Sequence, residues 1–202
     1  MKKPAGVGVL RSKKIDAIVE ATKILVLEEG YASVTYRSVA ARAGVATSLV
    51  QYYFPSLDDL FIAVLRRGTD QIIDRLTEVT RSVQPLRAVW ENASDRQGTA
   101  LLLEFMALAN HRKVIGAVIG EGGERIRQAL LENVSAKWSS YGLDDAGLSP
   151  RAVLFLMSCI PRMAHLEESF GALTGHAEAF EMVERFLDRV EPNDTEPGKS
   201  SP

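Results

Sequence analysis

The segment TYRSVAARAGVATSLVQYYFPSLDDL, residues 35–60, decides the fold of the N-terminal part of this chain. It holds two short stretches with the apolar spacing of helices, joined by the turn Ala43-Gly44-Val45. Glycine at position 44 allows the left-handed backbone that a tight reversal needs. Pro55 ends the second stretch, because the residue before a proline is pushed out of the helical region. Two short helices joined in this way predict a helix-turn-helix, whose second helix enters the major groove of DNA.

The outward side of the second short helix is rich in polar and aromatic groups. We expect a small core of valine and alanine between the two helices, formed by Val39, Ala40, Val45 and Val50. The side chains left to face solvent are Thr47, Ser48, Leu49, Gln51, Tyr52 and Tyr53. Glutamine can bind adenine through two hydrogen bonds, and threonine and leucine can contact thymine methyl groups. This face therefore predicts a surface that reads base pairs.

The charge distribution agrees with that prediction. The formal net charge is −2, but residues 1–56 hold 8 basic and 4 acidic side chains, and the remainder holds 16 and 22. A positive N-terminal part favours nucleic acid, because neutralised phosphates release counterions.

The rest of the chain has helical periodicity almost throughout and almost no strand alternation. We expect an all-α fold with about nine helices. They should run over about residues 12–29, 36–43, 47–53, 57–79, 86–94, 97–110, 112–141, 150–163 and 175–190.

Glycines in the seventh of these helices leave two interpretations open. Gly116, Gly120, Gly122 and Gly123 each weaken a helix by about 1 kcal/mol relative to alanine. Either the helix continues, with Gly116 and Gly120 allowing a close approach of another backbone, or it breaks near residues 120–123.

Two motifs carry a resemblance to a known family. They are T-x-R-x-V-A-x-x-A-G-V over residues 35–45 and Y-F-x-S-x-x-x-L over residues 53–60, after a helix that is followed by Gly30-Tyr31. In order and spacing they resemble the tetracycline-repressor-like (TetR) family of bacterial regulators, over the first third of the chain. Two residues depart from that family's pattern: Gln51 stands where a tyrosine is usual, and Leu57 where a phosphate-contacting lysine is usual.

The resemblance implies roles for the residues that match. Arg37 would reach a base edge or a phosphate. The side chains that would face bases are Thr47, Leu49, Gln51 and Tyr52, with Ser48 on the same surface. Those that would hold the DNA backbone are Tyr36, Tyr53 and Ser56. Lys13 and Lys14 are candidates for further phosphate contacts, with a merely solvated helix end as the alternative.

The resemblance also implies a homodimer that acts as a repressor and leaves a palindromic operator when a small, apolar molecule binds. The two C-terminal helices would pair with those of a second copy. Interface candidates are Phe180, Val183 and Phe186, with the core of their own chain as the alternative. Candidates for the effector site are Trp90, Phe105, Met106, Asn110, Trp138, Met157 and Met163, again with plain core packing as the alternative.

These expectations divide the chain into three parts. A DNA-binding head should cover residues 1–55, and a helical ligand-binding and dimerisation domain should cover 56–190. The polar stretch 191–202, rich in Pro, Gly and Ser, predicts a disordered tail.

Several function classes are disfavoured. Cys159 is the single cysteine, so no intramolecular disulfide can form. No run approaches the about 18 apolar residues of a membrane helix, and we expect a cytoplasmic protein. No H-E-x-x-H or G-x-S-x-G motif is present, so we expect no enzyme, no cofactor and no metal site. The remaining alternative is a helical adaptor that uses the two short helices only for packing.

Overall fold

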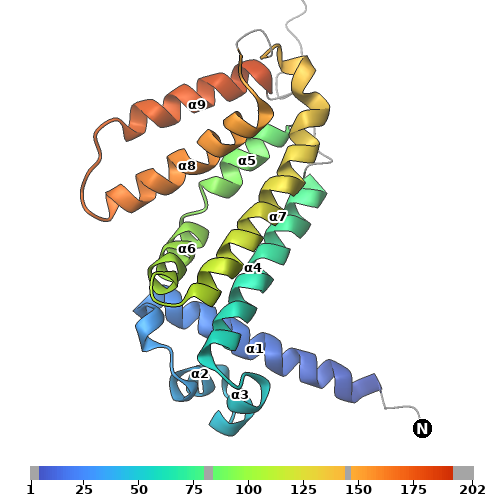
Figure 1. The fold of residues 1–202 in the computed structure, drawn as a ribbon, viewed down its shortest axis with the longest axis vertical. Coiled ribbons are helices and arrows are strands. Elements are labelled where there is room, and N and C mark those ends of the chain that lie inside the picture. Colours follow the sequence, from blue (N-terminus) through green and yellow to red (C-terminus); the bar gives the residue numbers. More distant parts are fainter. Residues whose placement is uncertain (1–4, 80–83, 144–146, 193–202) are drawn as a thin grey trace, which may run out of the picture. The chain divides into compact units, whose positions relative to one another are not determined.

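The computed structural model describes residues 5–79, 84–143 and 147–192, and over these ranges it is all-α, without a strand (Figure 1). The prediction of an all-α fold with about nine helices is confirmed for this part of the chain. The helices are α1 (Ala5–Glu29), α2 (Tyr36–Ala43), α3 (Thr47–Tyr53), α4 (Leu57–Val79), α5 (Pro85–Ala93), α6 (Arg96–Ala109), α7 (Lys113–Lys137), α8 (Pro150–Glu168) and α9 (His176–Val190), with 3-10 turns at Tyr31–Ser33 and Trp138–Tyr141.

Side-chain caps explain why several helices begin where the sequence predicts. Ahead of α2, Oγ1 of Thr35 accepts the backbone N–H of Ser38 at 3.0 Å, and Oγ of Ser38 accepts that of Thr35 at 2.9 Å. Ahead of α8, Oγ of Ser149 accepts the N–H of Ala152 at 3.2 Å, and Pro150 occupies the first position. Such caps satisfy N–H groups that have no partner inside the helix.

The first helix is longer than the sequence predicts. It begins at Ala5, so the expected start near Ser12 is wrong. Residues 5–11 include Gly6 and Gly8, which are poor helix formers, so the local pattern carries no helix signal there.

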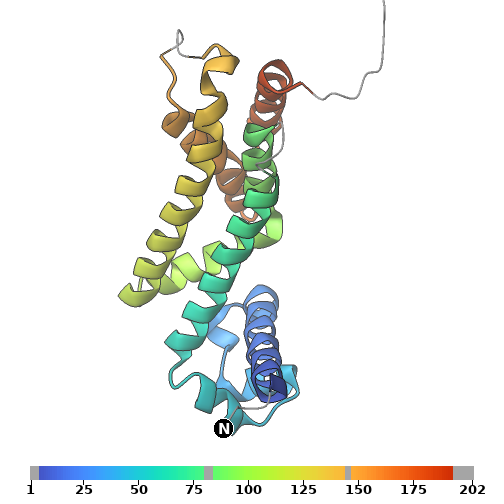
Figure 2. The ribbon, with the colours of Figure 1, turned by 90° about the vertical axis from the view of Figure 1, so that its right-hand side faces the viewer.

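The described chain divides into two packing units. The first comprises Met1–Gln71 and Ala100–Glu124, and the second Ile72–Thr99 and Arg125–Pro202. In the first unit, α1, α2 and α3 gather around the first turns of α4 (Figure 2), over a core that includes Ile18, Val26, Phe61 and Phe105. The limits of the packing units fall inside α4, α6 and α7, and the functional boundary between residues 55 and 56 stays a prediction.

The glycine-rich part of α7 is helical, so the alternative of a break near residues 120–123 is wrong. The close approach occurs at Gly122, where a Cβ atom would lie 2.6 Å from Oγ1 of Thr69 on α4. A Cβ at Gly116 would meet only Ala109 at 3.7 Å, and one at Gly120 would meet nothing within 4 Å. The missing side chain at Gly122 therefore allows α7 to pack closely on α4.

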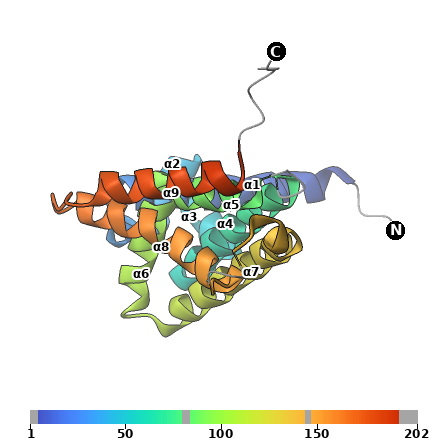
Figure 3. The same ribbon diagram turned by 90° about the horizontal axis from the view of Figure 1, so that it is seen from above.

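In the second unit, α8 and α9 lie side by side (Figure 3), and α5 packs against α8. Their shared core includes Leu86, Val134, Met157 and Leu187.

Glu191 corrects the expected start of the tail. Its side chain is only 3% exposed, and its carboxylate accepts the N–H groups of Leu86 at 3.0 Å and Arg87 at 2.9 Å. The carboxylate of Glu191 also accepts a hydrogen bond from the hydroxyl of Tyr141. Gln84 gives no side-chain cap to α5, so Glu191 supplies that cap from the far end of the chain. The rest of the predicted tail, from residue 193, lies outside the described residues.

Candidate nucleic-acid interface

The reversal between α2 and α3 is fixed by Gly44. Its φ of 66° lies in the left-handed region that favours glycine. The N–H of Val45 donates to the carbonyl of Ala40 at 3.0 Å, and that of Gly44 to Ala41 at 3.4 Å. This pair of bonds closes the end of α2 and sets the direction in which the chain enters α3.

The inner side of α3 anchors it to the first unit. Val50 is fully buried in the same apolar cluster as Val39 and Leu60, and Phe54 joins that cluster where the helix ends. The orientation of α3 is therefore determined by its apolar side chains, which leaves the opposite side free to bind a partner.

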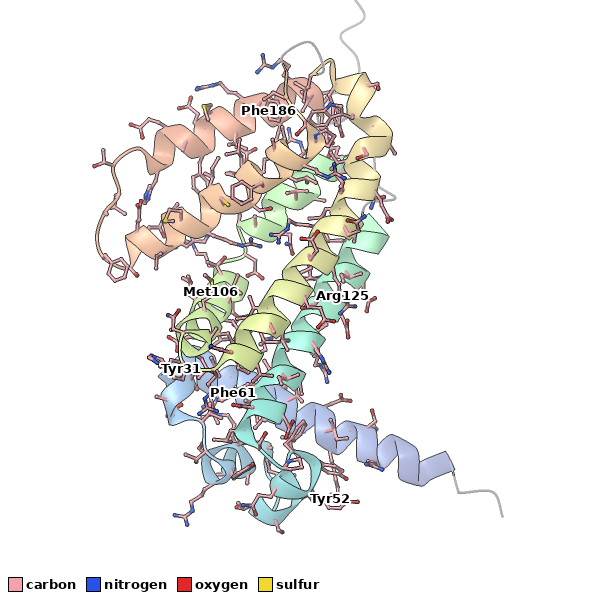
Figure 4. The ribbon with its side chains drawn as sticks, in the orientation of Figure 1. Tyr31, Tyr52, Phe61, Met106, Arg125 and Phe186 are labelled. Carbon is pink, nitrogen blue, oxygen red and sulfur yellow. The ribbon has the colours of Figure 1, made fainter. Side chains whose placement is uncertain are left out.

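The outer side of α3 carries an uncovered aromatic ring. Tyr52 is 70% exposed and points away from the core (Figure 4). Thr47, Ser48 and Gln51 are also exposed, as the sequence predicts, whereas Leu49 is partly buried. Tyrosine combines a large apolar ring with a hydrogen-bonding hydroxyl and is enriched at interfaces, so this surface, with its neighbouring polar groups, is a candidate for binding.

Tyr53 is held between α3 and α1. It is partly buried, its ring meets that of Tyr52 edge-on at 5.2 Å, and Cζ of Arg11 lies 5.7 Å from its centroid. A guanidinium over a tyrosine ring is an attractive cation–π contact. Arg11 was not among the candidate residues predicted from the sequence, because this contact joins residues that lie far apart in the chain.

A shallow hollow joins α1 to the exposed side of α3. It is lined by Lys14, Gly44, Val45, Ala46, Ser48, Leu49 and Tyr52. Lys14 thus brings an ammonium group to the surface that carries the expected base-reading side chains, while Lys13 is exposed nearby in the chain.

The starts of α2 and α4 contribute the remaining candidates. Arg37 is exposed, and Tyr36 is partly buried. Burial raises the pKa of Tyr36, and the Asp59 carboxylate adds to this effect, so its hydroxyl stays protonated and can donate. Oγ of Ser56 donates to Asp59 at 2.7 Å and accepts its N–H at 3.1 Å. Ser56 therefore caps α4, and its expected contact with the DNA backbone stays a prediction.

The expected effector residues are divided between the two cores and the surface. Trp90, Trp138 and Met157 are buried in the core of the second unit, and Phe105 is buried in the core of the first. Met106 is half-exposed on α6 (Figure 4), and Asn110 and Met163 are exposed. Burial favours the alternative of core packing for the first four residues, because apolar spacing identifies the buried side of a helix but not which helix covers it. An effector site at the other three stays a prediction.

One interface candidate is also corrected. Val183 is only 5% exposed and belongs to the core of its own unit, so it has little surface left for a second copy. Phe180 packs edge-on against Trp90, with 5.1 Å between ring centroids, and Phe186 is partly buried (Figure 4).

Neither a membrane-spanning helix nor a metal-binding cluster occurs among the described residues. None of their helices has the length and apolar character needed to cross a bilayer. Their His, Cys, Asp and Glu side chains form no group of three or more that could hold a metal ion.

Comparisons with known proteins agree with this geometry. Residues 18–64 match the model of the tetR family of bacterial regulatory proteins. The chain is 29% identical over 126 residues to the HTH-type transcriptional regulator HbdR of Aromatoleum sp., covering 59% of this chain and 55% of that protein. The chain spans about half the length of the curated relatives that it matches, 54% and 55%.

Solved structures extend the similarity to the whole fold. A TetR transcription regulator from Haloarcula marismortui superposes with a TM-score of 0.68 at 20% identity, over 89% of this chain and 98% of that one. The multidrug binding protein EbrR, solved with imidazole, superposes with a TM-score of 0.58 at 22% identity, over 93% of this chain and 98% of that one. At these identities the comparisons support the fold alone.

Proposed function

We propose that this chain, which belongs to the tetR family of bacterial regulatory proteins, represses transcription by binding operator DNA through α3. One observation carries the proposal: α3 is anchored by the buried Val50 and turns the uncovered Tyr52 outward with Thr47 and Gln51. A duplex would cover this surface and use its hydrogen-bonding groups.

Roles on the DNA follow from the positions of these side chains. Thr47, Ser48, Gln51 and Tyr52 would read base edges, with Leu49 in partial contact. Lys14, Arg37 and the protonated hydroxyl of Tyr36 would bind phosphate oxygens, and so fix the register of α3 in the groove. Lys14 from α1 would supply a phosphate contact of the kind that Leu57 cannot make.

The protein would act as a homodimer. On α8, Leu156 and Met163 are more than half exposed, and on α9 Met182 is likewise exposed with Phe186 one turn on. These apolar side chains lie on two adjacent helices, as a four-helix interface between two copies requires. Two α3 helices about 34–36 Å apart, or a multiple of this, would then meet successive major grooves.

The regulatory step would be a shift between conformations. In one conformation of the dimer the two α3 helices have the spacing that DNA requires, and in another they do not. A small molecule that binds better to the second conformation lowers the fraction of the protein that can bind DNA. The multidrug binding protein EbrR, solved with imidazole, is similar in fold, and this similarity supports the binding of a small molecule by this chain. A DNA partner would place its action in the cytoplasm.

Selection from random duplexes with the purified protein tests this function. We expect enrichment of a sequence with twofold symmetry, and an affinity that falls steeply as salt rises. Absence of enrichment in dilute salt would overturn the repressor and leave the helical adaptor.

The dimer has a separate test in sedimentation at micromolar concentration. We expect two copies for the wild type and one for Met182→Asp, because a carboxylate would be buried without a partner. Glu178→Asp, an exposed position on the same helix, should stay dimeric. A monomeric wild type would contradict the proposed interface.

A further inference from the structure

Arg11, Tyr53 and Tyr52 form a row of side chains in contact that joins α1 to the outer side of α3. Cζ of Arg11 lies 5.7 Å from the centroid of the Tyr53 ring. The Tyr53 ring meets that of Tyr52 edge-on, with 5.2 Å between centroids and 65° between planes. Both distances are those of attractive cation–π and edge-to-face contacts. The row therefore connects the first helix to the exposed ring that we propose to meet DNA.

The guanidinium of Arg11 differs from others in the first unit, which bind carboxylates in the pairs Arg42–Glu28, Arg67–Asp16 and Arg112–Asp58. Among the described residues, Arg11 contacts the ring of Tyr53 and no carboxylate. The attraction between this cation and the ring is therefore not weakened by a competing ion pair. Two roles are open to such a cation, which are to bind a phosphate or to hold the ring.

Tyr53 is the fixed member of the row. It is partly buried and packs against the apolar core of the first unit, whereas Tyr52 is largely exposed. An exposed side chain loses rotational freedom when it binds a partner, and this loss opposes binding. The contact with Tyr53 restricts Tyr52 before DNA is bound. Because Arg11 lies over the ring of Tyr53, it helps to fix the plane against which Tyr52 packs.

Lys14 gives a comparison within the same helix. It lies three residues after Arg11, so both cations are on one side of α1. Lys14 lines the hollow with Ser48 and Tyr52, where its ammonium group is available to a phosphate. Two neighbouring cations of α1 thus have different surroundings, since one faces an open hollow and the other an aromatic ring.

We propose that Arg11 is a positioning residue of the DNA-binding surface, which fixes the ring of Tyr53 and through it the orientation in which Tyr52 meets base edges. A side chain held in its bound orientation strengthens specific binding, because less freedom is lost on association. Binding to unrelated sequences depends mainly on phosphate contacts and does not need this orientation. The inference rests on the proposed function, and it gives α1 a part in sequence discrimination besides phosphate binding.

Fluorine NMR of the full-length protein without DNA tests the row. Labelling with 3-fluorotyrosine marks the five tyrosines, and Tyr52→Phe identifies the signal of Tyr52. In Arg11→Gln we expect this signal to move toward its position in the urea-unfolded protein, because the ring turns more freely. Arg11→Lys keeps a cation and should move it less, and Lys13→Gln, at an exposed position of the same helix, should leave it in place. An unmoved signal in Arg11→Gln would overturn the positioning role.

Binding to the selected duplex and to a scrambled duplex tests the consequence for recognition. In Arg11→Gln we expect the affinity for the selected duplex to fall by about twofold to fivefold and that for the scrambled duplex to change by less than about 1.5-fold. The slope of log affinity against log salt should be unchanged. Lys14→Gln should weaken both duplexes alike and reduce this slope by about 1. Equal losses on both duplexes in Arg11→Gln, or no loss on either, would overturn the proposal.

A double-mutant cycle tests whether Arg11 acts through the ring of Tyr53. Combined with Tyr53→Phe, which keeps the ring, Arg11→Gln should lower the ratio of the two affinities as it does in wild type. Combined with Tyr53→Leu, whose fold is checked by thermal melting, it should have no further effect. The same effect in both backgrounds would overturn the action through Tyr53. Failure of the wild type to bind any duplex would refute the repressor, whereas the position of Tyr52 is read from the fluorine signal alone.

Discussion

The surface around α3 and the second packing unit differ in where the residues that fix them lie in the sequence. Those that fix the surface are close together, and those that fix the second unit are far apart. In the first, a cap at Thr35, a left-handed glycine at 44 and a proline at 55 fix the backbone within one short segment. In the second, Glu191 caps α5 from 105 residues away, and Nε1 of Trp90 on α5 donates to Glu184 on α9. A site built from local signals can be predicted from its own segment, whereas a site assembled from distant helices needs the tertiary structure.

The largest effect should come from removing the distant cap. In Glu191→Ala the N–H groups of Leu86 and Arg87 and the hydroxyl of Tyr141 lose their buried acceptor. Buried donors without partners destabilise a protein, so we expect a loss of about 3 kcal/mol in the free energy of unfolding in urea. Glu181→Ala removes only a surface pair with Arg185 and should cost less than about 0.5 kcal/mol. Similar losses for the two variants would show that the second unit does not depend on this long-range cap.

Gln51→Ala tests the surface defined by local signals. We expect binding to the selected duplex to weaken by about 1–3 kcal/mol, with little change for a scrambled duplex, because the amide would read a base. Fluorescence anisotropy with labelled duplexes measures both. Gln128→Ala, at an exposed position on α7, should change neither. An equal loss on specific and scrambled DNA would make Gln51 a backbone contact.

The same contrast explains what could be predicted from the sequence. The turn at Gly44, the end of the second short helix before Pro55 and the exposed side of α3 were predicted, because each depends on neighbours within a few residues. Glu191 was assigned to a tail, since its partners lie elsewhere in the chain.

Apolar spacing also has a limit. It marked Trp90, Phe105 and Val183 as large groups on helical faces, but it could not assign them to two separate cores.

Packing in the first unit also depends on a contact between residues far apart in the sequence. Gly122 on α7 lies against Thr69 on α4, and substitution of this glycine tests the contact. A methyl group at this position would meet Thr69, so we expect Gly122→Ala to lower the free energy of unfolding by about 1 kcal/mol. Gly120→Ala has no such neighbour and should raise it by up to about 1 kcal/mol, since alanine favours a helix. Thr69→Ala combined with Gly122→Ala should recover the loss. If Gly122→Ala alone were as stabilising as Gly120→Ala, the close approach of α7 to α4 would be refuted.

The smallest effect should appear at alkaline pH in the second unit. Burial raises the pKa of Tyr141, and the hydrogen bond to Glu191 and the charge of that carboxylate add to this effect. Because the folded protein holds this proton more tightly than the unfolded chain, its contribution to stability is complete below about pH 10 and is lost as the pH rises further. Tyr141 is partly exposed, and solvent screening keeps the slope well below about 1.4 kcal/mol per pH unit.

Tyr141→Phe separates this contribution from other alkaline effects. The variant should unfold more easily than wild type at neutral pH, and the difference between the two should shrink above about pH 10 as the tyrosine of the unfolded chain ionises. Urea unfolding from pH 8 to pH 11 measures it, with Tyr52→Phe on the exposed side of α3 as the control, for which we expect no such trend. A constant difference across this range would mean that the hydroxyl of Tyr141 is not held by Glu191, and the long-range cap of α5 would then rest on two backbone N–H groups alone.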